Sequence, residues 1–330
     1  TQYNWSGNLS IQNTTNVTIA NNHTFSGSSI YNLKVWVENP NGNADCNNGN
    51  DTTLLENLVT SLNGVYTLGG VSPDFTSFTE LSTVLNNAGQ TGPVTVNVRD
   101  GDYYDQFTLS SITGNSFVNT LTIQGESGDS SLVRLWFDDN VTAFVLDIRS
   151  VKGLTLRDMT FHSVFSANNG AYKFIDCDTL KVENCFFKPQ FYNSASNSYH
   201  VQELYFERVK GGLIQDNNFG YANGIKIYES ELRILNNEAI SSGGSGSLNM
   251  NYSSNYSGSS KVIFSGNHIV LGTYTYANVP FYVRSNLWAY NQYQPDTVII
   301  SNNLVEFLGS GSATSHIRFS ENEYIVFKNN

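Results

Sequence analysis

The chain has 330 residues, of which 14% are charged and 13% aromatic, and its formal net charge is −11. Nucleic-acid binding needs clustered Lys and Arg, so this charge excludes that class of partner. No apolar run approaches the roughly 18 residues that cross a bilayer, and we expect no membrane insertion. Abundant Asn, Ser, Thr and Gly beside many aromatic residues predict an all-β, turn-rich protein.

Residues 1–60 differ in pattern from the rest of the chain. Short segments of alternating apolar and polar residues are separated by Asn/Gly-rich turns, which predicts strands. These segments are Trp5–Ile11, Asn16–Ile19, Ile30–Val37 and Thr53–Thr60. We interpret residues 1–60 as a small β domain of its own, and residues 61–330 as a second domain.

The second domain begins with the one helical pattern in the sequence. Phe78, Leu81, Val84 and Leu85 recur at helical spacing, between two strand-like segments. We expect a short amphipathic helix that caps the end of the structure that follows.

Seven segments in the second domain share one pattern of apolar, variable, apolar and polar residues that runs into a small or amide residue. They end at Met159, Cys185, Asn217, Asn237, Asn267, Asn303 and Asn330. Repeats of roughly 20 to 50 residues are typical of solenoids, propellers and arrays. One strand–turn unit per repeat with no helix between units predicts a right-handed parallel β-helix. The alternative, a β-sandwich with accidental periodicity, is disfavoured because three inward rows keep one register.

Stacked coils turn equivalent positions into rows along the axis, with alternate side chains pointing inward. One predicted row is Leu154, Leu180, Leu232, Val262, Val298 and Ile325; the second is Leu156, Val182, Ile214, Ile234, Phe264, Ile300 and Phe327; the third is Phe161, Phe187, Phe219, Ile269 and Val305.

The terminal amides should form a structural ladder of Asn217, Asn237, Asn267, Asn303 and Asn330, which starts only after Met159 and Cys185. We expect each ladder residue to take the left-handed conformation that Asn and Gly tolerate best. Asn267→Leu should cost about 1–3 kcal/mol through lost buried hydrogen bonds.

Three stretches interrupt the repeats: Phe187–His200, the Gly/Ser-rich Ser241–Ser260, and Leu271–Pro295. The last one is rich in aromatic residues, whose ring faces can stack on sugars. Its candidate carbohydrate-binding residues are Tyr282, Trp288, Tyr290 and Tyr293. The alternative is that these rings pack on the coil beneath them.

Acidic residues recur at similar places in four successive repeats, with Arg149 and Arg208 beside them. They are Asp147, Asp176, Glu207 and Glu229. In one outward row they would supply oxygen ligands for Ca²⁺, the one cofactor that we consider. We favour the alternative, a solvated face of alternating charge. For Cys177 and Cys185 we favour buried free thiols over a disulfide.

Two segments resemble parts of large secreted or cell-surface proteins of Bacteroidota. Residues 31–45 with Asn50-Asp51-Thr52 resemble the last strands of their immunoglobulin-like domains, so residues 1–60 would be the C-terminal half of such a domain. Residues 64–104 resemble the entry to their pectate-lyase-like β-helices. The resemblance implies an extracellular or cell-surface location and further domains of the same long chain. The last repeat stops on Asn330, and since solenoids end in caps, we expect truncation there.

We therefore favour a fragment of an adhesin-like protein whose β-helix acts as a rigid stalk or glycan-binding module. Its partner would be a glycan or another extracellular polymer. The alternative is a polysaccharide lyase or glycoside hydrolase. Polygalacturonase-like enzymes on this fold use clustered aspartates and a Gly-His-Gly segment, and neither pattern is intact here. We predict no catalytic residue.

Overall fold

The computed structural model describes residues 3–8, 10, 13–19, 25, 31–38, 49, 51–138, 144–163, 172–188, 204–220, 225–241, 248–251, 260–271, 281–284, 297–307, 318–320 and 324–330. The chain divides into two compact units, Thr1–Thr60 and Ser61–Asn330. Among the described residues no helix is both long and apolar enough to cross a membrane.

The first unit contains an antiparallel pair of strands, β1 (Tyr31–Trp36) and β2 (Thr52–Leu58), with Val35 opposite Thr53. Where the structure describes the expected strands Trp5–Ile11 and Asn16–Ile19, it shows no strand, and that prediction was wrong. Alternation marks a sequence that suits a pleated surface, but a strand also needs a neighbouring backbone to pair with. The immunoglobulin-like origin of this unit stays a prediction.

The second unit opens with β3 (Leu62–Leu68), α1 (Phe78–Ala88) and β4 (Gln90–Val98). The helix begins where the Ser77 hydroxyl accepts a hydrogen bond from the Glu80 N–H at 3.0 Å. It ends at Gly89, whose φ of 71° suits glycine. Phe78, Leu81, Val84 and Leu85 are all buried, as predicted, and α1 packs on β6 (Phe107–Ser110).

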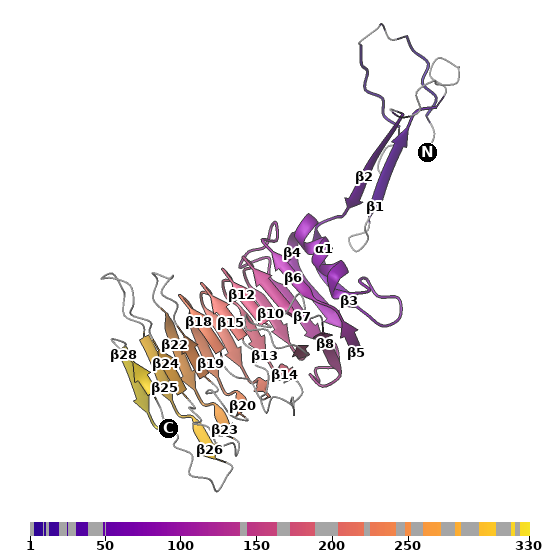
Figure 1. The fold of residues 1–330 in the computed structure, drawn as a ribbon. Coiled ribbons are helices and arrows are strands. Elements are labelled where there is room, and N and C mark those ends of the chain that lie inside the picture. The colour runs from indigo at the N-terminus through magenta and orange to yellow at the C-terminus, as the bar shows by residue number, and fades with distance from the viewer. Residues whose placement is uncertain are drawn as a thin grey trace. The chain divides into compact units, whose positions relative to one another are not determined.

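The remaining strands of the second unit form stacked parallel sheets (Figure 1). In the described residues the largest sheet has ten strands: β3, β4, β7 (Leu121–Gly125), β10 (Leu154–Arg157), β13 (Lys181–Glu183), β16 (Gly212–Gln215), β19 (Glu231–Leu235), β22 (Lys261–Ser265), β25 (Thr297–Ser301) and β28 (Tyr324–Lys328). The described eight-stranded sheet contains β5 (Gly101–Tyr104), β8 (Val133–Phe137), β11 (Thr160–Ser163), β14 (Phe186–Lys188), β17 (Asn218–Phe219), β20 (Glu238–Ser241), β23 (His268–Leu271) and β26 (Leu304–Phe307).

The third side of the coils is built from two smaller sheets. Within the described chain, one has five strands: β6, β9 (Leu146–Arg149), β12 (Tyr172–Ile175), β15 (Leu204–Glu207) and β18 (Ile225–Tyr228). The other has three: β21 (Leu248–Asn251), β24 (Phe281–Arg284) and β27 (Arg318–Ser320). The chain visits the three sides in turn, and this arrangement is a right-handed parallel β-helix, as predicted.

Two details of the predicted coil were wrong. A complete coil contributes three strands rather than one strand–turn unit. The interrupting stretches 241–260 and 271–295 each contain a strand, β21 and β24, and β21 lies beside β18. Each strand is only four residues long and stands inside a longer stretch that interrupts the repeats, so its short alternation was not recognised, whereas the backbone pairing supplied by the neighbouring coil holds it in place.

The predicted inward rows are confirmed where the structure describes them. The second row is in register from strand to strand and buried at Leu156, Val182, Ile214, Ile234, Phe264 and Ile300. In the third row, Phe187 lies between Phe161 and Phe219, with ring centroids 5.4 and 5.3 Å apart. Ala239 follows Phe219 in register and precedes Ile269.

Candidate functional site

Four of the five predicted ladder residues lie at the turn between the ten-stranded and eight-stranded sheets, and Asn330 takes the equivalent position after β28. The Asn267 backbone N–H and side-chain Nδ2 both donate to Asn303 Oδ1, at 2.9 and 3.0 Å. Asn267 Nδ2 also donates to the Ile234 carbonyl at 3.0 Å. The same contacts link Asn217 to Asn237, Asn237 to Asn267 and Asn303 to Asn330. Each amide therefore satisfies buried backbone groups of its neighbouring coils.

The left-handed conformation belongs to the residue before each ladder position, and the prediction for the ladder residue itself was wrong. The residues with positive φ at this turn are Asp158, Asn184, Asp216, Asn236, Gly266, Asn302 and Asn329. The ladder amide has to point into the coil, so the sharp bend falls one residue earlier. All seven are Asp, Asn or Gly, the residues that adopt this conformation at least cost.

Cys185 occupies the ladder position one coil before Asn217. Its backbone N–H donates to Asn217 Oδ1 at 2.9 Å, and its Sγ lies 3.3 Å from the Glu183 carbonyl. Cys177 and Cys185 are both buried free thiols, which confirms the favoured prediction. Burial raises the pKa of Cys177 to about 11 and that of Cys185 to about 12, so both stay protonated and unreactive near neutral pH.

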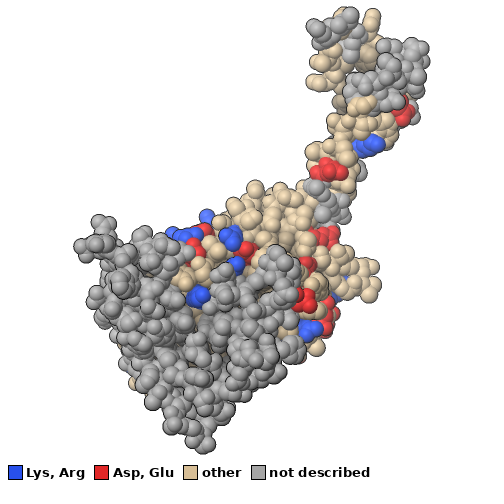
Figure 2. All heavy atoms as spheres, viewed as in Figure 1, with Lys and Arg blue, Asp and Glu red and all other residues tan. Residues whose placement is uncertain are grey.

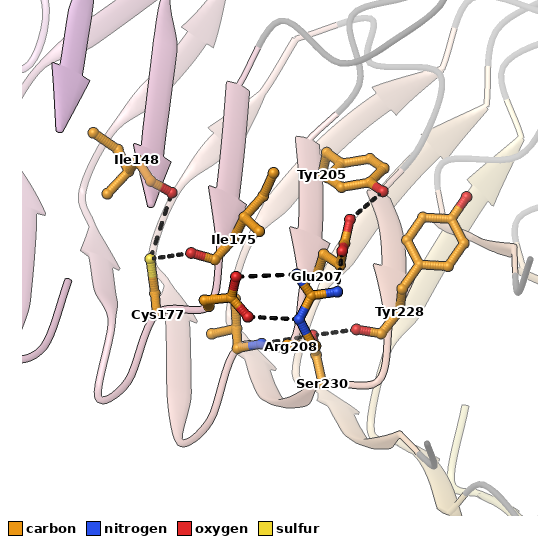
Figure 3. A network of polar contacts seen from close by, with 10 residues as sticks. Ile148, Ile175, Cys177, Tyr205, Glu207, Arg208, Tyr228 and Ser230 are labelled. Carbon is orange, nitrogen blue, oxygen red and sulfur yellow. Dashed lines mark hydrogen bonds and ion pairs between the residues drawn. The ribbon is translucent and has the colours of Figure 1, made fainter. Parts of the chain in front are cut away.

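A network of polar contacts joins two coils at the ends of β12 and β15 (Figure 3). The Arg208 guanidinium donates through Nε and Nη2 to the two oxygens of Asp176, at 2.5 and 3.0 Å. Arg208 Nη1 also contacts Glu207 Oε1, and the Tyr205 hydroxyl donates to Glu207 Oε2 at 2.6 Å. Tyr205 and Glu207 share one face because they are two residues apart on one strand. That spacing is the sequence signal that would have found Tyr205.

The electrostatics of this network favour the ionised carboxylate. The hydrogen bond from Arg208 lowers the pKa of Asp176, against a smaller opposing effect of burial. The same hydrogen bond raises the pKa of Arg208. One coil earlier, Arg149 Nε donates to Asp147 at 2.7 Å, which raises the pKa of Arg149. A general acid needs a raised carboxyl pKa. Asp176, whose pKa is lowered, is therefore suited to pairing with the Arg208 guanidinium rather than to donating a proton.

The four predicted acidic residues do not form one outward row. The register of β9 and β12 places Asp147 opposite Lys173, whereas Arg208 binds Asp176 from the next coil. Among the described residues no group of three His, Cys, Asp or Glu side chains could hold a metal ion. Figure 2 shows acidic and basic side chains interspersed over the visible described surface of the second unit. Asp147 pairs with Arg149, and Asp176 and Glu207 pair with Arg208, so opposite charges adjoin at these positions, in line with the alternative that the sequence favoured.

The predicted carbohydrate-binding residues Trp288, Tyr290 and Tyr293 lie outside the residues that the structure describes. Tyr282 lies in β24, opposite Asn249 of β21, and its side chain is outside the described part. Their assignment as a glycan site therefore stays a prediction.

His162 should make the stability of the protein depend on pH. It is 4% exposed, and burial, with Lys188 and Arg134 nearby, lowers its pKa from 6.5 to about 4. The unfolded chain takes up this proton first, so the stabilisation is complete above about pH 6.5 and is lost as the pH falls toward 4. At pH 4.5 the loss should be on the order of 2 kcal/mol. Between pH 7 and 4.5, the melting midpoint of His162→Gln should therefore fall less than that of the wild type.

The control for this measurement is Val118→Ala, since Val118 is 79% exposed and carries no titratable group. Its melting midpoint should follow the wild type across the same pH range. An equal fall in the wild type and His162→Gln would show that other groups cause the pH dependence.

Comparison with known proteins gives a likeness of fold. No protein-family model matches the chain, and no curated protein matches it in sequence. Among solved structures, the deglycosylated pectin methylesterase from Aspergillus niger is 14% identical, with 82% of this chain and 87% of that chain covered and a TM-score of 0.40. Pectin methylesterase from carrot is 10% identical, covers 82% and 90% of the two chains and has a TM-score of 0.36. The fold assignment rests on the strand pairing of the chain itself.

Proposed function

We propose that residues 61–330 form a rigid stalk in an adhesin-like protein that is secreted or displayed at the cell surface. The observation that carries the proposal is the amide ladder, which binds five successive coils to one another from Asn217 to Asn330 and is buried from Asn217 to Asn303. Backbone pairing on each side of the coil and stacked aromatic rings also hold neighbouring coils together. In a solenoid each repeat contacts only its neighbours, so stiffness depends on such coil-to-coil bonds.

The sequence supports the remaining parts of this proposal. We assign residues 1–60 to the C-terminal part of an immunoglobulin-like domain, with further domains in the same long chain. The partner is a glycan or other extracellular polymer, bound by stretches that interrupt the repeats, such as the one that contains Trp288. Loops on a rigid scaffold are the usual place for such contacts.

Single-molecule pulling on the whole chain, held at its two ends, tests the stalk. The short first unit should extend first, because an isolated pair of strands such as β1 and β2 is only marginally stable. The coils should extend later and at higher force. Coils that peel apart before the first unit extends would contradict a stalk.

The alternative function is a polysaccharide lyase or glycoside hydrolase, and the network around Arg208, in which the Arg208 and Asp176 side chains are partly exposed, is the observation that favours it. Under our proposal, the wild type releases no reducing ends or unsaturated products from uronate-containing glycans, with or without Ca²⁺. If the wild type releases product and Asp176→Ala or Glu207→Ala does not, the stalk proposal is refuted and the enzyme function takes its place. Ser265→Ala, in a distant coil, is the control variant for that comparison.

A further inference from the structure

Aromatic side chains gather on the outer face of the eight-stranded sheet, at β5 and β8. The strand alternation turns Tyr103 and Leu135 inward, whereas Tyr104 and Trp136 point outward and are opposite each other in register. The ring centroids of Tyr104 and Trp136 are 4.8 Å apart with an interplanar angle of 67°. Phe137 stacks on Tyr104 at 5.3 Å and 29°. Three rings from neighbouring coils thus form one cluster.

The core does not require this cluster. Val133 and Leu135 fill the interior below β8 and are fully buried, whereas Phe137, the last residue of the strand and next in the same alternation, is half-buried and stacks on Tyr104. Tyr104 is 54% exposed, and Trp136 and Phe137 are half-buried. A group of large aromatic side chains that stays accessible on a strand face is a common mark of a binding surface.

Hydrogen-bonding groups surround the rings. Arg134 Nε donates to Asp102 Oδ1 at 2.6 Å, and the Arg134 guanidinium lies 5.4 Å from the centre of the Trp136 ring. The Tyr104 hydroxyl donates to Asp138 at 2.5 Å. The Asp102 and Arg134 side chains are 63% and 30% exposed, so both can reach a ligand. Ring faces bordered by carboxylate and guanidinium groups match a sugar, which has apolar C–H faces and a rim of hydroxyls.

We propose that Tyr104, Trp136 and Phe137 form a stacking platform for a neutral glycan, with Asp102 and Arg134 binding its hydroxyls. The proposal deepens the proposed function, since it gives the stalk a glycan site of its own. Asp102 and Asp138 are two carboxylates against the one guanidinium of Arg134, in a chain of net charge −11. This balance repels uronates and other acidic sugars, so the ligand class is neutral.

Binding of the whole chain to an array of neutral and uronate-containing glycans, with affinities from calorimetry, tests this site. The wild type should bind neutral glycans in preference to uronates. Tyr104→Ala and Trp136→Ala should each weaken binding by about tenfold or more, because each removes a stacking face. Tyr104→Phe keeps the ring and should bind like the wild type.

Phe117→Ala is the matched control, because Phe117 is 56% exposed and has Lys152 5.7 Å from its ring centre but lies outside the cluster. Its affinity should equal that of the wild type. If Trp136→Ala strongly lowers the melting midpoint, its loss of affinity is not informative. The affinity of Tyr104→Ala then decides whether the platform binds the glycan, because the Tyr104 side chain is 54% exposed.

Three results would overturn the platform: no neutral glycan bound by the wild type, a preference for uronates, or unchanged affinity in Tyr104→Ala. Binding lost in Trp288→Ala but retained in Tyr104→Ala would move the site to the stretch 271–295. The pulling experiment separates this proposal from the stalk. If the coils resist force but the chain binds no glycan, only the platform is refuted. If the chain binds a glycan but its coils peel apart easily, only the stalk is refuted.

Discussion

Asn267→Leu should lower the free energy of unfolding by roughly 3–5 kcal/mol, more than the sequence alone led us to expect. Asn267 is 1% exposed, and its Oδ1 accepts from the Asn237 N–H and Nδ2 at 2.8 and 3.0 Å. Leucine leaves both of these donors and the Ile234 carbonyl without their partner. Each buried polar group that loses its hydrogen bond costs about 1–3 kcal/mol, and the coils are too closely stacked to admit water easily.

Denaturant unfolding followed by circular dichroism measures this effect. The matched control is Asn236→Gly, one coil earlier in the same turn. Asn236 is exposed and has a φ of 55°, a conformation that glycine adopts freely, so this variant should stay within about 0.5 kcal/mol of the wild type. Equal midpoints for Asn267→Leu and the wild type would show that the ladder contributes nothing to stability.

The coils were predictable from sequence because their interior has to repeat. Leu156, Val182 and Ile214 occupy equivalent positions in consecutive coils, and an apolar side chain is needed at each. The strands β21 and β24 were missed because Leu248–Asn251 and Phe281–Arg284 are only four residues long, too short for their alternation to stand out, and are held by pairing with neighbouring backbones. The left-handed turn was misplaced by one residue because adjacent Asn residues, such as Asn236 and Asn237, give the same compositional signal.

The polar contacts were harder to predict than the fold. Arg208 and Asp176 are 32 residues apart, as are Arg134 and Asp102. Which residues meet across coils depends on the length of the segment between the strands, and this length varies from coil to coil. The sequence therefore singled out Asp176 and Arg208 as charged residues at similar places in successive repeats. It did not show that the two side chains pair with each other. It gave no sign that Tyr104 and Trp136 meet, because their contact depends on the same register.

Phe187→Ala should destabilise the protein by about 3–5 kcal/mol, the usual cost of removing a fully buried aromatic ring. Phe187 is 1% exposed. Its ring lies 5.4 Å from Phe161, 5.3 Å from Phe219 and 5.0 Å from Tyr172, measured between centroids. Alanine would leave a cavity in the middle of this stack, and the backbone pairing of β14 with β11 and β17 keeps the neighbouring coils from closing it.

Phe186→Ala is the control, because it removes the same side chain from the adjacent position of the same strand. Phe186 points outward and is half-buried, so its loss should cost less than about 1 kcal/mol. Urea unfolding of the two variants compares the faces of β14 directly. A shift of one residue in strand register exchanges inward and outward side chains. Equal losses in the two variants, or a larger loss in Phe186→Ala, would therefore contradict the register on which the inward rows, the amide ladder and the outward aromatic platform all depend.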